Sequence, residues 1–311
     1  MSAKSMRDQF AETMLELGQE DNNLVVLVGD ISHFILQPFA KACPGRYYNV
    51  GICEPTIISM AAGLAKMGFV PVAHTIAPFL IERSFEQIKL DFGYHQLGGN
   101  LITVGSAFDY SNLGCTHHCY SDFALLKTLP GSQIVYPASP VEFDILFRQV
   151  YANGQLTLYR LPAYQHEQVL DSKDIEFGKG VKVIEGEDVT IVATGPHLKA
   201  ALGAREQLTA HSIDAEVIYL HTIRPLDDNL ILSSASKTRR VIVIEEHAQS
   251  GGVGEEIARL LHTVGPIQFS SVCIPDEFQR EYGTYHDHCE RLGFSPEGIN
   301  NQIQREFNFK A

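Results

Sequence analysis

Glu54 is the residue of this chain whose type and position most directly indicate chemistry. It lies in "YYNVGICEPTIISMAAGLAKMG", residues 47 to 68, between an apolar strand pattern and a helix pattern rich in small residues. Gly51 permits a tight turn and Pro55 suits a first helical position, so we expect Glu54 at the start of the helix. The carboxyl ends of parallel strands carry ligand sites in α/β folds, which makes this acid a candidate for proton transfer. The alternative is a carboxylate that only complements the helix dipole.

Two further segments resemble binding motifs without meeting their requirements. "CTHHC", residues 115 to 119, contains zinc-ligand types, but adjacent histidines cannot readily reach one ion together with both cysteines. A structural zinc site would also need a second pair, for which "HDHC" at 286 to 289 is the only candidate, so we predict no metal ligands in this chain. "QSGGVGEEIARLL", residues 249 to 261, is flanked by acids of the wrong charge for phosphate, and we interpret its glycines as turn and packing residues.

The elements that must position these residues form two α/β units. The first half alternates helical patterns with apolar, β-rich runs at 24–30, 47–52, 70–76, 101–106 and 133–139. Nearly continuous apolar strands are typical of a parallel sheet buried on both faces. After a polar stretch without a sustained period, strand patterns return at 188–195, 215–223 and 239–247. We predict two parallel-sheet α/β domains, residues 1–165 and 182–311, joined by a linker at 166–181.

Composition excludes several classes of protein. The chain has 24 Lys and Arg against 37 Asp and Glu, and its net charge of −13 would repel a nucleic acid. No apolar run approaches the length that spans a bilayer, and the first residues lack the apolar core of a signal peptide. Six cysteines in 311 residues are too few for a disulfide scaffold. We therefore expect a cytoplasmic protein with reduced thiols and with neither a nucleic acid nor a membrane as its partner.

The stretch "GRYYNVGICEPTIISMAAGLAKMGFVPV" resembles the transketolase pattern of an aromatic strand, Gly-Ile-x-Glu, and a helix that ends in Ala-x-Gly-Leu-Ala. The similarity continues nearly end to end. The segments "HTIAPFLIERSFEQIKLD", "GCTHH", "LYRLP", "HTIRPLD" and "PDEFQREYG" follow in the order expected of transketolases and deoxyxylulose-phosphate synthases. The resemblance implies a thiamine diphosphate pyrimidine-binding domain followed by a transketolase C-terminal domain.

The resemblance also implies residues that bind the cofactor. In the family the glutamate that matches Glu54 hydrogen-bonds N1′ of the aminopyrimidine of thiamine diphosphate, where it can share a proton as a catalytic group. Phe79 is similar to the aromatic residue that packs on the pyrimidine in split transketolases, although the long transketolases place that ring at the position of Leu80. Arg83 and Phe85 follow and would border the ring. The alternative for Phe79 is packing in the apolar core, and for Arg83 and Phe85 it is surface or core packing.

On the substrate side, the resemblance gives matches and departures. His117 matches a histidine that contacts the donor ketose, and Arg160 matches the arginine that holds the substrate phosphate, a role that suits a guanidinium. The alternatives are a buried structural histidine and an exposed arginine after a strand. Leu113 and Gly105 replace an Asp and a His of transketolases, and Phe34 lies near a phosphate-contacting Ser. Because these changes remove polar contacts, we expect an anionic substrate other than the common pentose phosphates.

The resemblance covers only two of the three domains of a complete transketolase. The Gly-Asp-Gly motif that holds Mg²⁺ and the diphosphate is absent, and the nearest match, "VGDISHF", lacks the second glycine. The chain is thus most similar to the second subunit of a split transketolase, with thiamine diphosphate as cofactor and Mg²⁺ held by a separate subunit that carries the diphosphate-binding domain. Family members pair across a two-fold axis, so we expect an α2β2 assembly.

Two other functions fit the same residues. The first is the β subunit of a 2-oxo acid dehydrogenase, which shares both domains and the glutamate. The Thr-His of "GCTHH" and the segment "PDEFQREYG" favour transketolase over this alternative. The second is a non-catalytic scaffold subunit that kept the fold. Our primary hypothesis is a transferase that is active only with its partner subunit and moves a two-carbon ketol unit between sugar phosphates or sugar-like anions.

Overall fold

A computed structural model describes residues 4 to 309 of the protein. A seven-stranded sheet forms the centre of its first half. Its strand order is β10-β5-β6-β4-β3-β1-β2, and all neighbours are parallel except β10 and β5. The strands are β1 (Leu24–Val28), β2 (Tyr47–Asn49), β3 (Val70–Ile76), β4 (Gly99–Val104), β5 (Gln133–Val135), β6 (Leu156–Leu161) and β10 (Thr222–Arg224).

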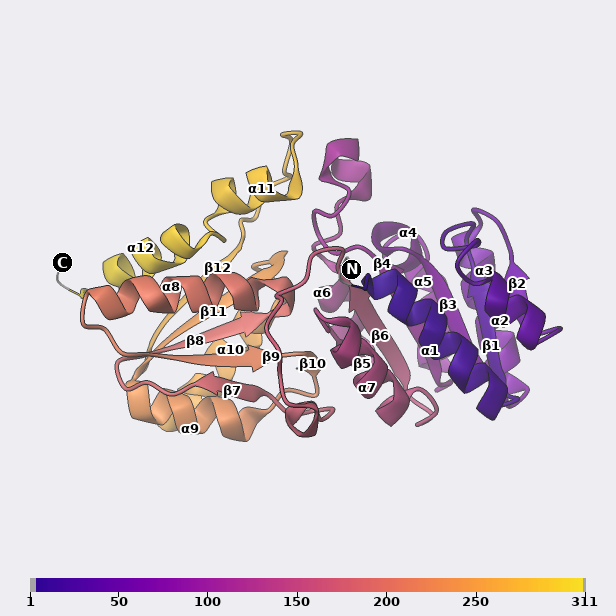
Figure 1. The fold of residues 1–311 in the computed structure, drawn as a ribbon, viewed down its shortest axis with the longest axis horizontal. Coiled ribbons are helices and arrows are strands. Elements are labelled where there is room, and N and C mark those ends of the chain that lie inside the picture. The colour runs from indigo at the N-terminus through magenta and orange to yellow at the C-terminus, as the bar shows by residue number, and fades with distance from the viewer. Residues whose placement is uncertain (1–3, 310–311) are drawn as a thin grey trace.

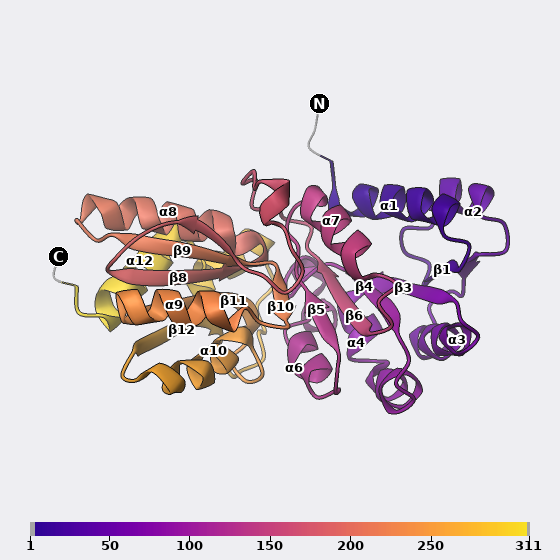
Figure 2. The same cartoon turned by 90° about the horizontal axis from the view of Figure 1, so that it is seen from below.

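The helices and turns of this half are α1 (Met6–Glu20), α2 (Gln37–Ala42), α3 (Glu54–Lys66), α4 (Ala77–Ile81), α5 (Phe85–Gln87), the π-helix η1 (Ile88–Tyr94), the 3₁₀ turns η2 (Ser111–Leu113) and η3 (Cys115–His117), α6 (Asp122–Lys127) and α7 (Pro140–Val150). Of these, α1 precedes β1, and the others lie in the connections between successive strands. Figure 2 shows α1 and α7 on one face of the sheet and α3 and α6 on the other. β1, β4 and β6 are buried along their whole length, and β3 is buried except at its ends, as their continuous apolar runs predict.

The second sheet has five strands in the order β12-β11-β8-β9-β7, with only β7 antiparallel to its neighbour. Besides β10, the strands, helices and 3₁₀ turns of the second half are η4 (Ser172–Asp174), β7 (Val181–Ile184), β8 (Val189–Thr194), η5 (Gly195–His197), α8 (Leu198–Ala210), β9 (Ala215–Leu220), α9 (Asp228–Thr238), β11 (Arg240–Ala248), α10 (Val253–Leu261), η6 (His262–Val264), β12 (Gln268–Ile274), α11 (Tyr285–Leu292) and α12 (Pro296–Glu306). Figures 1 and 2 show the two halves side by side, with α8 and α12 opposite α9 and α10 across the second sheet.

One predicted strand proves to be two. The apolar run 215–223 is divided at His221. β9 belongs to the second sheet, whereas β10 pairs antiparallel with β5 of the first, with Thr222 opposite Val135. An apolar run predicts a buried strand but does not indicate which sheet the strand joins, so the sequence pattern could not show this division. The second half of the chain therefore completes the edge of the first sheet.

A buried carboxylate ties the two halves together. Glu246, on β11, accepts hydrogen bonds from Ser106 Oγ at 2.9 Å and the Phe108 amide at 3.2 Å in the first half. In the second half it accepts from Tyr285 Oη at 2.9 Å and lies 3.1 Å from His197 Nε2. Burial alone would raise the pKa of Glu246, but the hydrogen bond and charge of His197, the charge of Arg160 and the hydrogen bond from Ser106 together lower that pKa to about 2. The acid is therefore ionised and fully partnered at the domain junction.

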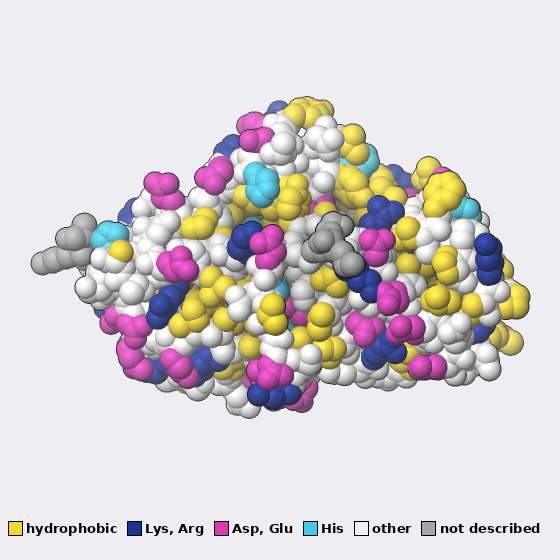
Figure 3. All heavy atoms as spheres, viewed as in Figure 1, with side chains coloured by type: hydrophobic (Ala, Val, Ile, Leu, Met, Phe, Trp, Pro, Cys, Tyr) yellow, Lys and Arg dark blue, Asp and Glu magenta, His cyan; other side chains and the backbone are white. Residues whose placement is uncertain are grey.

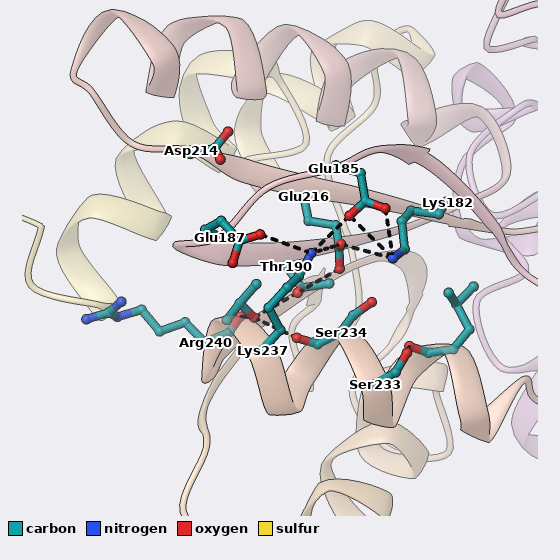
Figure 4. A network of polar contacts seen from close by, with 12 residues as sticks. Lys182, Glu185, Glu187, Thr190, Asp214, Glu216, Ser233, Ser234, Lys237 and Arg240 are labelled. Carbon is teal, nitrogen blue, oxygen red and sulfur yellow. Dashed lines mark hydrogen bonds and ion pairs between the residues drawn. The ribbon is translucent and has the colours of Figure 1, made fainter.

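A second buried acid lies in the other sheet. Glu216 on β9 is fully buried, and Figure 4 shows it among the lysines that neutralise it. Lys237 Nζ lies 2.6 Å and Lys182 Nζ 3.5 Å from Glu216 Oε2, and both lysines also reach the exposed Glu185. The hydrogen bond to Glu216 raises the pKa of Lys237 despite some desolvation. A buried carboxylate needs such partners because an unpaired one would be strongly destabilising.

The surface agrees with the charge pattern of the sequence. On the face in Figure 3 acidic and basic side chains are interspersed, and hydrophobic side chains gather between them. None of the helices within residues 4–309 is long and apolar enough to cross a membrane.

Candidate functional site

Glu54 stands at the first position of α3, as its sequence neighbours predict. Gly51 turns the chain with a φ of +80°, Cys53 is the N-cap residue, and Pro55 occupies the first turn. The Glu54 side chain is only 2% exposed. The helix is not buried all round, since Met60 and its neighbours on one side are exposed. α3 thus buries its carboxylate at one end and leaves an apolar stripe open along its length.

Four predicted site residues lie together at this end of α3. Arg83 Nη1 is 2.8 Å from Glu54 Oε2, and its guanidinium carbon lies 4.1 Å from the centroid of the Phe79 ring. The Phe79 ring in turn meets the His117 ring edge to face, with 5.0 Å between centroids. A planar group that donates an N–H to Glu54 and stacks on Phe79 therefore fits this site, because the guanidinium of Arg83 does both. An aminopyrimidine has the same planar shape and polar edge.

His117 is half-buried beside this cluster. Its Nδ1 lies 3.0 Å from Thr116 Oγ1, and its ring centroid is 6.2 Å from that of Tyr110. Burial, and then the positive charge of Arg83, lower the pKa of His117 below its usual value. The imidazole is therefore neutral at pH 7 and can both donate and accept a hydrogen bond, as a contact to a carbonyl or hydroxyl requires.

The three positions at which this sequence differs from the transketolase pattern lie in different surroundings. Gly105 follows β4 with a φ of +83°, and a Cβ there would lie 3.1 Å from the Tyr110 ring, so a histidine would be strained as well as crowded. Leu113, at the end of η2, and Phe34 are exposed, Phe34 to 87%. Phe85 is half-buried and packs on the core of the first domain, which fits the alternative given for it above.

Arg160 does not fit its predicted contact with a substrate anion. Its side chain is fully buried on β6, and its Nε lies 3.0 Å from Asp122 Oδ2. Its Nη1 and Nη2 donate to the carbonyls of Glu246 at 2.9 Å and Cys119 at 2.5 Å. The guanidinium also lies against the ring of Phe123, 4.7 Å from its centroid. We therefore correct this prediction: Arg160 is an interior residue at the domain junction.

A second arginine, which the sequence did not indicate, is only partly buried and acts on the surroundings of His117. Arg7 on α1 donates from Nε to Ser32 Oγ at 3.2 Å, and that hydroxyl is 2.8 Å from His74 Nε2. Burial raises the pKa of Tyr110 while the charge of Arg7 lowers it in part, so this cation acts on a residue that borders His117. In the sequence Arg7 is one charge on an amphipathic helix, and nothing local links it to residue 32.

The two predicted zinc-type segments do meet, but they form no metal site within residues 4–309. His118 and His288 have ring centroids 5.5 Å apart, and burial lowers the pKa of His118 to about 4. Among the described side chains no group of three or more potential ligands is close enough to hold an ion. Both rings pack on Phe108, so the pair contributes to the junction between the halves.

The glycine-rich segment before α10 is filled by the protein itself. Glu245 accepts from the backbone amides of Val253 at 2.5 Å and Gly254 at 2.8 Å, at the helix N-terminus. A Cβ on Gly252 would lie 2.5 Å from the same carboxylate. A carboxylate thus occupies the amides that a nucleotide phosphate would need, which confirms turn and packing roles for these glycines.

Comparison with known proteins places the two halves separately. The family model described as "Transketolase, pyrimidine binding domain" matches residues 2–162, and "Transketolase, C-terminal domain" matches residues 178–299. These matches confirm the predicted pair of α/β domains.

Relatives of similar length match both halves at once. A subunit of the apulose-4-phosphate transketolase of Phocaeicola vulgatus is 32% identical over 296 residues, which are 94% of this chain and 94% of that protein. The 6-deoxy-6-sulfo-D-fructose transketolase subunit SqwH of Clostridium sp. is 32% identical over 279 residues, 88% of this chain and 85% of that protein. A solved structure described as "Split gene transketolase, inactive beta4 tetramer" superimposes with a TM-score of 0.88 at 30% identity, covering 99% of both chains.

Proposed function

The chain belongs to the transketolase family, and we propose that it is the second subunit of a two-component transketolase that transfers a two-carbon ketol unit between sugar phosphates or similar anionic substrates. The family implies thiamine diphosphate as the cofactor. Relatives that this chain matches over nearly their whole length are named transketolase subunits, which supports the division of the enzyme between two chains. The observation that carries the proposal is the contact series from Glu54 through Arg83 and Phe79 to His117.

Each residue of this series has a role that its surroundings permit. When bound, thiamine diphosphate supplies carbanion chemistry that no side chain can supply. Glu54 would hold the aminopyrimidine and share a proton with its N1′, and burial keeps competing water from that proton. Phe79 would carry the ring on its face. His117, neutral at pH 7, would contact a carbonyl or hydroxyl of the substrate.

The diphosphate and Mg²⁺ would be held by a partner subunit, since the Gly-Asp-Gly motif is absent from the sequence. An apolar surface beside the site supports this partner. Ser59 Oγ donates to Asp91 Oδ2 at 2.6 Å, so α3 and η1 lie side by side. Large apolar side chains are exposed here, namely Met60 on α3, Met67 directly after it, and Leu90 and Tyr94 on η1. Monomeric proteins rarely expose such surfaces, so we propose that this one is covered in the complex. Two copies of this chain and two partner subunits related by a two-fold axis would give the proposed α2β2 assembly.

For the substrate we propose an anionic sugar or sugar-like compound whose hydroxyl groups make few hydrogen bonds with the site. Leu113 and Gly105 carry no polar side chain, and Phe34 is an exposed ring. The anionic group needs a cation that can be reached. Since Arg160 is fully buried and paired, we propose that Arg7, which is only partly buried, fills that role.

The experiment replaces Glu54 by Gln in the complex with the partner subunit. The amide keeps the size of the side chain but cannot share a proton, so kcat should fall by about 10²-fold or more with the fold intact. Glu86→Gln is the matched control, because Glu86 lies nearby on α5 with an exposed side chain. Activity of Glu54→Gln equal to that of the control would refute the proposed role of this acid. Loss of activity also separates a catalytic subunit from a scaffold.

A further inference from the structure

Arg83 meets the two groups that the cofactor ring is proposed to meet. Its Nη1 is 2.8 Å from Glu54 Oε2, and its guanidinium carbon lies 4.1 Å from the Phe79 ring centroid. We propose that Arg83 is a positioning residue that stands in for the pyrimidine, and that the ring binds by displacing its guanidinium. The inference rests on the function proposed above and adds to it a step in cofactor binding that the chain itself controls.

The contacts of Glu54 explain why a stand-in is needed. Its side chain is 2% exposed, and the ion pair with Arg83 balances its charge. A buried carboxylate without a partner is strongly destabilising, so the side chain would otherwise turn toward water. The guanidinium is planar and carries several N–H donors, which lets it pair with a carboxylate and stack on a ring at once. It thus keeps Glu54 and Phe79 in the arrangement that a planar heterocycle needs.

The surroundings of Arg83 let its side chain leave while its backbone stays. The side chain is 44% exposed, so water can solvate the displaced guanidinium. The Arg83 amide donates to the Pro78 carbonyl at 3.0 Å, and Ser84 Oγ donates to the Phe79 carbonyl at 3.2 Å. These bonds fix the turn that follows α4. Displacement therefore requires only rotation about the side-chain bonds of Arg83, and Phe79 remains in place.

The stand-in also slows cofactor binding, because its contacts must break first. A half-exposed ion pair and a cation–π contact together correspond to roughly a tenfold change in an equilibrium constant. The same positive charge lies close enough to His117 to lower its pKa. Displacement would remove a cation from both Glu54 and His117, the two groups proposed to face cofactor and substrate.

The first test measures how fast phenylglyoxal modifies Arg83 in the complex with the diphosphate-binding partner, with and without thiamine diphosphate and Mg²⁺. Peptide mass spectrometry separates Arg83 from Arg148, which pairs with Asp144 on α7 and should react equally in both states. Bound ligands usually protect arginines in their site. Displacement predicts the opposite, a reaction at Arg83 at least about threefold faster with cofactor. Protection or no change would overturn the inference.

The second test measures the association rate constant of thiamine diphosphate by stopped flow. Arg83→Met should raise it about tenfold, Arg83→Lys, which cannot stack as a plane, should raise it less, and the control Arg148→Met should leave it unchanged. Slower association or weaker binding in Arg83→Met would show that Arg83 holds the cofactor instead. If Arg83→Met does not fold, Arg83→Lys and the modification rate still decide. A wild-type complex that binds no cofactor would refute the proposed function itself, and the inference with it.

Discussion

Asp109 is a carboxylate that the folded protein holds at an energetic disadvantage. Its Oδ2 accepts from the amides of Ser106 at 2.5 Å and Ala163 at 3.1 Å. Its Oδ1 is buried and has no hydrogen-bond partner among the described residues. Burial, and then the negative charge of Glu246, raise the pKa of Asp109 from 3.8 to about 6. We predict that Asp109→Asn stabilises the protein near neutral pH.

The pKa sets the size and the sign of the effect. A pKa of about 6 in place of 3.8 corresponds to about 3 kcal/mol at about 1.4 kcal/mol for each unit. Because the folded pKa is the higher one, the stabilising contribution of the protonated acid is complete below pH 3.8 and is lost as the pH rises through 6. Asparagine keeps an oxygen for the two amides and carries no charge. The free energy of unfolding of the variant, relative to that of the wild type, should therefore increase as the pH rises from about 4.5 to 7.5.

The assay is the Tm of wild type and variant at closely spaced pH values. For a domain of this size about 3 kcal/mol corresponds to a Tm difference of about 5 °C or more at pH 7.5, shrinking toward pH 4.5. Asp171→Asn is the control. Asp171 is exposed, and its hydrogen bond with Lys173 lowers its pKa, so its replacement should not stabilise the protein at any pH. Parallel curves for Asp109→Asn and wild type would refute the assignment of this titration.

Two further predictions concern cations. Asp122→Ala should destabilise the protein by about 3–5 kcal/mol, because it removes the carboxyl group 3.0 Å from the Nε of the buried Arg160 and the oxygen that accepts from the Phe123 amide. Denaturant unfolding checks this, and a loss below about 1 kcal/mol would show that carbonyl and ring contacts suffice. Arg7→Gln should raise KM for anionic ketoses, xylulose 5-phosphate and sulfonated analogues alike, by about tenfold, with kcat within about twofold. An unchanged KM would exclude Arg7 from substrate binding.

The sequence predicted best what is encoded locally. The strands at 24–28 and 70–76 coincide with apolar runs long enough to exclude other interpretations, and Glu54 is placed by Gly51 and Pro55 beside it. These features depend on residues a few positions apart, whose effect on backbone conformation is strong. The edges of the strands differ by only a few residues from the predicted ones.

What the sequence could not show depends on contacts between distant segments. Arg160 resembles a substrate-binding residue by its motif, and only the fold reveals that Asp122 and the carbonyl of Glu246 surround it. The link between Asp109 and Glu246 joins residues more than a hundred positions apart, and neither has a local pattern that indicates a partner. Burial of a charge is decided by such contacts rather than by residue type.

The domain junction gives the second half of the chain a part in the candidate site. The segment from Gly105 to His117 carries three of the residues predicted on the substrate side, and the second half holds it at both ends. Ser106 Oγ donates to Glu246 at 2.9 Å, and Ser111 Oγ donates to the Gly283 carbonyl at 2.8 Å. A Cβ on Gly114 would lie 2.9 Å from the Tyr282 ring, so the two segments pack closely there. By contrast, Glu54, Phe79 and Arg83 are held by α3 and α4 of the first half. The residues proposed to face the cofactor are thus held by one domain alone, whereas the geometry of those proposed to face the substrate depends on both.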